Sequence, residues 1–95
     1  MTKTLYQRIT VDQVISTSPV KIYALIITSD GNGDADAGVY DGESTSDNKI
    51  VTLYTVDESL ASIIFAEPLE TQRGLFIDIG SNVTEVLVQY TSERE

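Results

Sequence analysis

The sequence lacks the side chains that carry most metal binding and nucleophilic chemistry in proteins. It has no histidine, no cysteine and no tryptophan, and Met1 is its single methionine. Histidine and cysteine are the commonest zinc ligands, and a serine or threonine nucleophile needs a neighbouring base to activate it. The composition therefore argues against an enzyme, and we expect a protein that acts by binding, without a cofactor.

Basic residues are also scarce. The chain has six Lys and Arg against fifteen Asp and Glu, which gives a net charge of −9. Binding to nucleic acids depends on cationic contacts with phosphates, and anionic membranes attract basic segments rather than acidic ones. The longest apolar run, residues 23–27, is far shorter than the ~20 residues that span a bilayer. We therefore expect neither nucleic acid nor a membrane as a direct partner.

The charge is distributed unevenly along the chain. Residues 1–29 contain Lys3, Arg8 and Lys21 but only one acidic residue, Asp12, whereas the rest of the chain is strongly acidic. Such asymmetry indicates either an arm that docks on an acidic partner or a surface turned away from the acidic loops.

Short runs of β-branched and aromatic residues alternate with Gly, Asp, Asn and Pro along the chain. This pattern is typical of strands joined by turns. Residues 20–28 are apolar at both alternating sets of positions after Lys21, which predicts a central strand covered on both faces. Residues 75–79 and 85–90 predict a hairpin with a tight connection, and residues 14–15 predict one helical turn before Pro19. Further strands are expected at residues 5–11, 35–41, 49–55 and 62–65.

The chain of 95 residues suffices for one domain, and about seven short strands at regular spacing predict an all-β antiparallel β-sandwich. Strand spacing alone does not choose between a jelly-roll-like and an immunoglobulin-like order. We divide the chain into an N-terminal arm with an edge strand, residues 1–19, and a β-sandwich domain, residues 20–95. Exposed sheet edges invite pairing with another chain, so we also expect a homo-oligomer.

Acidic and amide side chains recur at alternate positions in the loop after the central strand, at Asp30, Asn32, Asp34 and Asp36. Oxygen ligands at alternate positions suit calcium. However, Ala35 stands where the glycine of an EF-hand loop belongs, and no flanking helices are expected. The pattern favours a solvated turn, so we expect no metal, with these four residues as the calcium candidates.

Four segments resemble small β-sandwich structural proteins of tailed bacteriophages. They are residues 22–30, 39–46, 74–79 and 86–90, among which the Tyr-Asp-Gly turn at 40–42, followed by Ser and Thr residues, is the most specific. The resemblance covers residues 20–90 and consists of strand and turn patterns. It implies a virion component, foremost a capsid cement or decoration protein that is made in the host cytoplasm and located on the capsid exterior.

This resemblance implies the major capsid protein as partner, and local threefold positions of a capsid favour a trimer. Lys3, Tyr6 and Arg8 are then the expected capsid contacts, and removal of residues 1–9 is expected to abolish binding while leaving the sandwich folded. A head–tail joining or tail component is the alternative position in a virion. A small carbohydrate-binding β-sandwich module, with exposed tyrosines stacking on sugar rings, is the alternative outside it.

Overall fold

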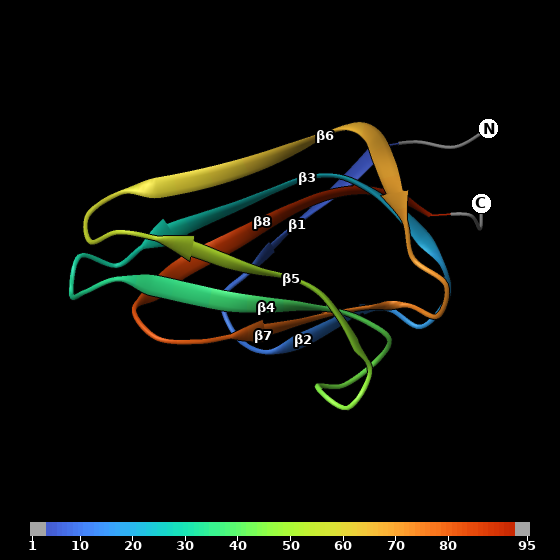
Figure 1. Ribbon diagram of the computed structural model, residues 1–95, viewed down its shortest axis with the longest axis horizontal. Helices are drawn as coiled ribbons and strands as arrows, with labels where there is room; N and C mark the ends of the chain where they lie inside the picture. Colours follow the sequence, from blue (N-terminus) through green and yellow to red (C-terminus); the bar gives the residue numbers. More distant parts are fainter. Residues whose placement is uncertain (1–3, 93–95) are drawn as a thin grey trace.

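The computed structural model describes residues 4–92, which form eight β-strands and no helix (Figure 1). The all-β class predicted from the sequence is confirmed, with one strand more than expected. The strands are β1 (Thr4–Ile9), β2 (Gln13–Ser16), β3 (Val20–Ser29), β4 (Ala35–Asp41), β5 (Asn48–Thr55), β6 (Leu60–Glu70), β7 (Leu75–Ile79) and β8 (Val83–Ser92).

The strands form two four-stranded antiparallel sheets that pack face to face. Sheet A has the order β1-β8-β3-β6, and sheet B has the order β2-β7-β4-β5. The first strand pairs with the last, β2 with β7, β3 with β6, and β4 with β5, so the chain resembles one long hairpin wrapped into two layers. This is the strand order of a jelly roll, which decides between the two sandwich types that the sequence leaves open.

The core lies between the sheets and explains the alternating sequence pattern. Along each strand every second side chain points inward, so Val86, Val88 and Tyr90 of β8 are buried while the residues between them are not. Burial of apolar area at about 25 cal/mol per Å² is the main force that holds the layers together. The largest fully buried side chains are Ile9, Val20, Ile22, Leu25, Ile27, Val39, Leu75, Ile77, Val86 and Val88.

The central strand β3 has a bulge that explains its unusual pattern. Val20 and Ile22 are fully buried, and so are Leu25 and Ile27, which requires a change of phase between the two pairs. The register with β6 and with β8 shifts around Tyr23, so this residue is the extra one of a β-bulge. The strand is central, as expected, but its outer face is only half covered. Apolar residues occur at both alternating sets of positions because the bulge switches which set points into the core.

The segment that the sequence assigns to an N-terminal arm contributes a strand to each sheet. β1 is an edge strand of sheet A and β2 an edge strand of sheet B. The helical turn expected at residues 14–15 is wrong, because Val14 pairs with Phe76 in an antiparallel ladder and tertiary pairing overrides a short local preference. Ile9 is fully buried, so removal of residues 1–9 would take away a core side chain as well as an edge strand.

The hairpin expected from β7 and β8 is also wrong. β7 lies between β2 and β4 in sheet B, whereas β8 lies between β1 and β3 in sheet A. The short connection between them crosses from one sheet to the other, and Asn82 adopts a positive φ of 57° there. A tight connection limits the distance between two strand ends but does not determine which sheet the second strand joins.

Candidate interaction surface

The outer face of sheet A carries rows of side chains that cross the strands. Successive residues of a strand point to opposite faces, so the neighbours of buried residues such as Ile9 and Val88 point to solvent. We call three of these rows the neutral face. Its rows are Tyr6, Gln89, Ala24 and Ile64; Arg8, Leu87, Ile26 and Ser62; and Glu85, Thr28 and Leu60.

Large apolar side chains on the neutral face are unusually exposed. Ile64 is 78% exposed, Tyr6 74% and Leu60 60%. Ile64 lies directly opposite Ala24, whose single methyl group gives it little cover. Leu60 and Ile64 lie on the edge strand β6, and Tyr6 lies on the opposite edge strand β1. Single exposed apolar residues are common on monomers, but apolar residues that share one face are typical of an interaction site.

The three rows of the neutral face carry one positive and one negative side chain, Arg8 and Glu85, which form an ion pair. Beyond these rows, the outer face of sheet A continues with Lys21 and its register partner Glu70, again one positive and one negative residue. Arg8 Nε donates a hydrogen bond to Glu85 Oε1. The two side chains are 58% and 30% exposed, so water screens this ion pair and it contributes little to stability. In a protein with a net charge of −9, a sheet face without net charge is a place where another surface can approach without electrostatic repulsion.

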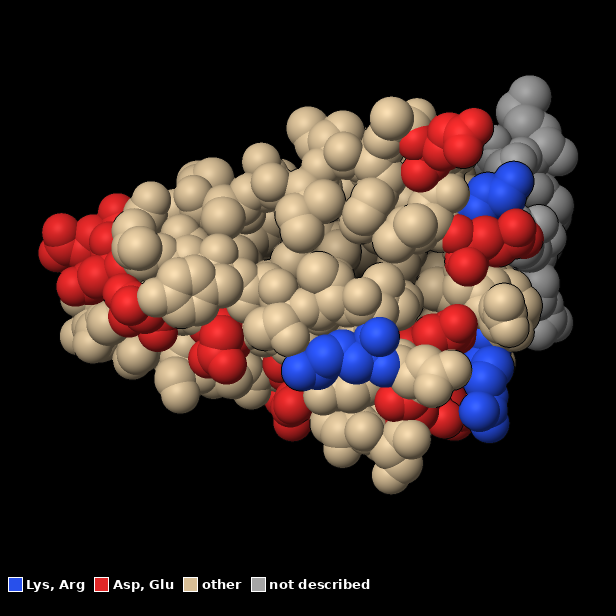
Figure 2. Space-filling model, viewed as in Figure 1, with Lys and Arg blue, Asp and Glu red and all other residues tan. Residues whose placement is uncertain are grey.

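The acidic side chains gather elsewhere, most densely at one end of the molecule (Figure 2, left). This end is formed by the β3–β4 and β5–β6 connections, whose exposed acidic residues are Asp30, Asp34, Asp57 and Glu58. Figure 2 also shows an uncharged area over the middle of β6. We call the group of four carboxylates the acidic end.

The four calcium candidates serve as hydrogen-bond acceptors and donors within the loops. Asp30 Oδ1 accepts the N–H of Asn32 at 2.9 Å, and Asp36 Oδ1 accepts the N–H of Ser81 at 3.0 Å. Asp34 turns toward the β5–β6 connection, where its carboxylate accepts the N–H of Asp57 at 3.0 Å.

The hydroxyl of Tyr54 donates to Asp34 Oδ2 at 2.5 Å, and this hydrogen bond raises the pKa of Tyr54. Asn82 Nδ2 donates to the carbonyl oxygen of Asp34 at 3.1 Å. Within residues 4–92, no three acidic side chains are arranged to hold a metal ion. The hydrogen bonds of Asp34 therefore join the β3–β4 connection to β5, to the β5–β6 connection and to the β7–β8 connection.

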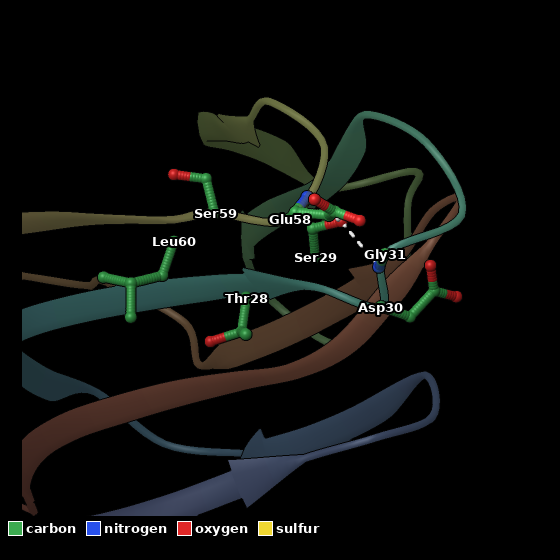
Figure 3. A pocket seen from close by; sticks show the side chains of 7 residues that line it. All are labelled: Thr28, Ser29, Asp30, Gly31, Glu58, Ser59 and Leu60. Carbon is green, nitrogen blue, oxygen red and sulfur yellow. Dashed lines mark hydrogen bonds between the residues drawn. The ribbon is translucent and has the colours of Figure 1, made fainter.

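A shallow, open hollow of about 520 Å³ lies where the neutral face meets the acidic end (Figure 3). Ser29 organises it, because its hydroxyl accepts the N–H groups of Gly31 at 3.1 Å and Glu58 at 3.3 Å and donates to the carbonyl of Gly33 at 3.0 Å. The hollow thus has the acidic residues Asp30 and Glu58 and the apolar side chain of Leu60 in its lining. It is lined by Thr28, Ser29, Asp30, Gly31, Glu58, Ser59 and Leu60.

The outer face of sheet B has a different character. Tyr40 and Phe76 form a tilted ring pair with centroids 6.2 Å apart, and Lys49 Nζ lies 5.7 Å from the Tyr40 ring centre. The same ring covers Gly38, where an added Cβ would lie 2.8 Å from Tyr40 Cε1. With Gly38 beneath the ring and Lys49 beside it, Tyr40 is a packed residue rather than an open stacking platform.

A pair of carboxylates lies on the same side of sheet B. Burial raises the pKa of Asp78, and the neighbouring Asp12 carboxylate raises it further. Asp12 Oδ1 also accepts the N–H of Ile79 at 2.8 Å, which fixes it beside the end of β7. Asp12 is exposed and Asp78 is half-buried, and both lie on an open sheet face. Acid–base chemistry works best in a site that excludes water, which this open face does not do.

The structure brings two of the three sequence-predicted contact residues together. Tyr6 and Arg8 lie on the neutral face next to Gln89 and Leu87, respectively. Lys3 lies outside the described residues. Sequence reasoning missed Leu60 and Ile64; the uncharged run at residues 60–66 indicates their segment but not which of its side chains point outward.

No protein-family model, curated protein or solved structure matches the chain. Within residues 4–92 there is no helix with the length and apolar character needed to cross a membrane.

Proposed function

We propose that the protein is a non-enzymatic structural component of a tailed-bacteriophage virion, a capsid cement or decoration protein that binds the major capsid protein on the capsid exterior. The observation that carries this proposal is the neutral face, an exposed, partly apolar sheet surface without net charge on a strongly acidic molecule. Such a surface favours adhesion. The resemblance of residues 20–90 to phage β-sandwich proteins supplies the assignment to a virion.

The size of the neutral face favours binding through many copies. With strands about 4.8 Å apart and rows about 6.8 Å apart, its outermost Cα atoms span about 14 Å in each direction. That is about 200 Å² of sheet, against the roughly 800 Å² that each partner of a stable complex buries. A homo-oligomer, for which local threefold capsid positions favour a trimer, multiplies the contact area without a new binding surface.

The alternatives place the same adhesive surface elsewhere or use another surface. A head–tail joining or tail component would use the neutral face in the same way, and labelling of intact particles with an antibody would distinguish the positions. A carbohydrate-binding module would use tyrosines as stacking platforms. The packing of Tyr40 between Gly38, Phe76 and Lys49 argues against that use of Tyr40.

Binding to capsids assembled without the protein tests the proposal, with two matched variants. Ile64→Lys places a charge in the neutral face, whereas Val11→Lys places the same charge in the β1–β2 connection, where Val11 is 64% exposed. Co-sedimentation with capsids should show wild-type and Val11→Lys protein bound, and at least about tenfold weaker binding of Ile64→Lys. Bound protein should also raise the temperature at which the capsids break open.

Two results would overturn the proposal. Equal binding of both lysine variants to capsids would show that the neutral face is not the contact surface. Absence of wild-type protein from the capsid pellet at all concentrations would remove the function itself.

A further inference from the structure

The edge strand β6 has an open backbone edge. Within residues 4–92 it pairs only with β3, and its first half, residues 60–64, keeps an unbroken register with β3. An edge strand presents unpaired N–H and C=O groups that can form a ladder with a further strand. Proteins blunt such edges with charges, prolines and bulges. Residues 60–66 contain no charged residue and no proline, and the irregular pairing with β3 begins only after Ile64.

The other edges are better protected. β2 has only four residues, β1 carries Arg8, and β5 carries Lys49 and a register shift. β6 is the longest strand, with eleven residues, and its Glu67, Pro68 and Glu70 all lie in its last part. β6 is therefore the edge where this fold is most open to an added strand.

The charges beside β6 indicate the chemistry of that strand. Between Lys49 and Arg73 the sequence has four acidic residues and no basic one. Asp57 and Glu58 lie just before β6, separated from it by Ser59. Glu67 and Glu70 lie near its end, where Glu70 is the register partner of Lys21 on β3. An uncharged edge with acidic residues at both ends is complementary to an uncharged strand with basic residues at both ends.

A second copy of the chain is a poor occupant of this edge. Antiparallel self-pairing of β6 would bring Asp57 and Glu58 of one copy beside Glu67 and Glu70 of the other. The exposed carboxylates would repel each other, and two acidic molecules would already resist approach. A homo-oligomer is therefore expected to use another surface.

We infer that β6 binds an extended segment of a partner protein by strand addition, and that this segment has an apolar, β-prone centre of about five residues flanked by Lys or Arg. The hollow at the start of β6 provides a place for one basic side chain, because Asp30 and Glu58 line it beside Leu60 (Figure 3). Backbone hydrogen bonds supply affinity, and the acidic flanks select the partner.

This inference rests on the proposed function only in taking the protein to act by adhesion, and it names the chemistry of the partner segment. The test uses purified full-length protein and synthetic peptides, with no capsid present. Failure of the peptide test with intact capsid binding would overturn only this inference, and the reverse result would overturn only the proposed function.

The experiment measures fluorescence anisotropy of labelled peptides titrated with the protein at low salt. The first peptide has a five-residue Val, Thr and Ile centre with two lysines at each end; a second has glutamates in place of the lysines; a third has the lysines but N-methyl groups at alternate central residues. We expect binding of the first, at least about tenfold weaker binding of the second, and no binding of the third, whose methyl groups block the ladder.

Two matched protein variants locate the site. Glu58→Lys reverses a charge beside β6, and Glu43→Lys reverses one in the β4–β5 connection at the opposite end of the sandwich. Glu58→Lys should weaken binding of the lysine-flanked peptide about tenfold, whereas Glu43→Lys should weaken it less than about threefold. Equal binding of lysine- and glutamate-flanked peptides, or binding of the N-methylated one, would overturn the inference. So would concentration-dependent dimerisation of the protein that Ile64→Lys abolishes, because the occupant would then be a second copy.

Discussion

Asp41 is the side chain whose charge the fold uses most directly. At the end of β4, its carboxylate accepts the backbone N–H groups of Gln72 at 3.0 Å, Arg73 at 2.8 Å and Gly74 at 3.3 Å. Burial by itself raises the pKa of Asp41, but these three N–H groups and the Arg73 charge outweigh it, so the pKa lies below its ordinary value of 3.8. The ionised carboxylate thereby joins β4 to the connection between β6 and β7.

We expect Asp41→Asn to lower the free energy of unfolding at neutral pH by about 1 kcal/mol, because a neutral amide oxygen accepts weaker hydrogen bonds. Since the pKa is lower in the folded protein, the stabilisation is fully present above the unfolded pKa and is lost as the pH falls through the folded pKa. The difference between wild type and variant should therefore narrow below about pH 4. Urea unfolding at neutral and acidic pH measures it, with exposed Glu43→Gln as control. A difference that stays constant with pH would refute this role for the charge.

At the same scale, the sequence identified part of the candidate surface. The basic N-terminal segment drew attention to Tyr6 and Arg8, and both lie on the neutral face. Leu60 and Ile64 were not found, because residues 60–66 are apolar at both alternating sets of positions, and such a run does not reveal which side chains point outward. Only the pairing with β3 settles their direction.

At the scale of elements, β1 shows that an edge strand need not be an appendage. It pairs with β8 along all six of its residues, and Ile9 at its end is fully buried in the core. Deletion of residues 1–9 removes this side chain, leaves a cavity, and exposes the edge of β8.

We expect the chain without residues 1–9 to lose at least about 3 kcal/mol of the free energy of unfolding, since loss of a large buried side chain alone costs about 2–5 kcal/mol. For a domain of this size, that loss is a large share of the whole free energy of unfolding. Part of the shortened protein should therefore be unfolded at 25 °C. Urea unfolding followed by far-UV circular dichroism measures the change. Tyr6→Ser, at a 74% exposed position of the same strand, should change stability by less than about 0.5 kcal/mol. Undiminished stability of the shortened chain would mean that β1 is an independent arm.

The strands that the sequence predicts most accurately are those with a clear apolar pattern between turn residues. The predicted ranges 35–41, 49–55 and 75–79 agree within one residue with β4, β5 and β7, along which apolar side chains alternate. The range 20–28 agrees equally well with β3 because of its long apolar run, although a bulge interrupts the alternation there. β2 was missed because four residues carry too little periodicity to outweigh the nearby Pro19. The separation of β7 and β8 into different sheets, and the bulge at Tyr23, depend on contacts between distant segments. Local spacing contains no information about either.

At the scale of the whole molecule, the acidic end and the neutral face occupy different places. The molecule extends over 40 × 26 × 19 Å, with the acidic end at one extremity of its long axis (Figure 2). The Debye length is about 8 Å at physiological ionic strength and about 30 Å at 0.01 M salt. At physiological ionic strength, repulsion therefore acts mainly between neighbouring carboxylates, as within the acidic end. At low salt, carboxylates over the whole molecule repel one another.

This arrangement predicts that sodium chloride stabilises the fold, and that most of the effect occurs at low concentration. The net charge of −9 favours the expanded unfolded chain, so raising the salt from about 0.01 M to about 0.15 M should raise the unfolding midpoint by several degrees, with a smaller change beyond that. Glu58→Lys and Glu43→Lys reduce the net charge equally. Because Glu58 lies among the carboxylates of the acidic end, its reversal should give the higher midpoint at low salt and the flatter salt dependence. Thermal unfolding in a sodium chloride series measures both; sodium chloride is preferred over sulfate, which strengthens apolar burial by itself. A midpoint that falls as salt is added would mean that attractive ion pairs such as that of Arg8 with Glu85 outweigh the repulsion.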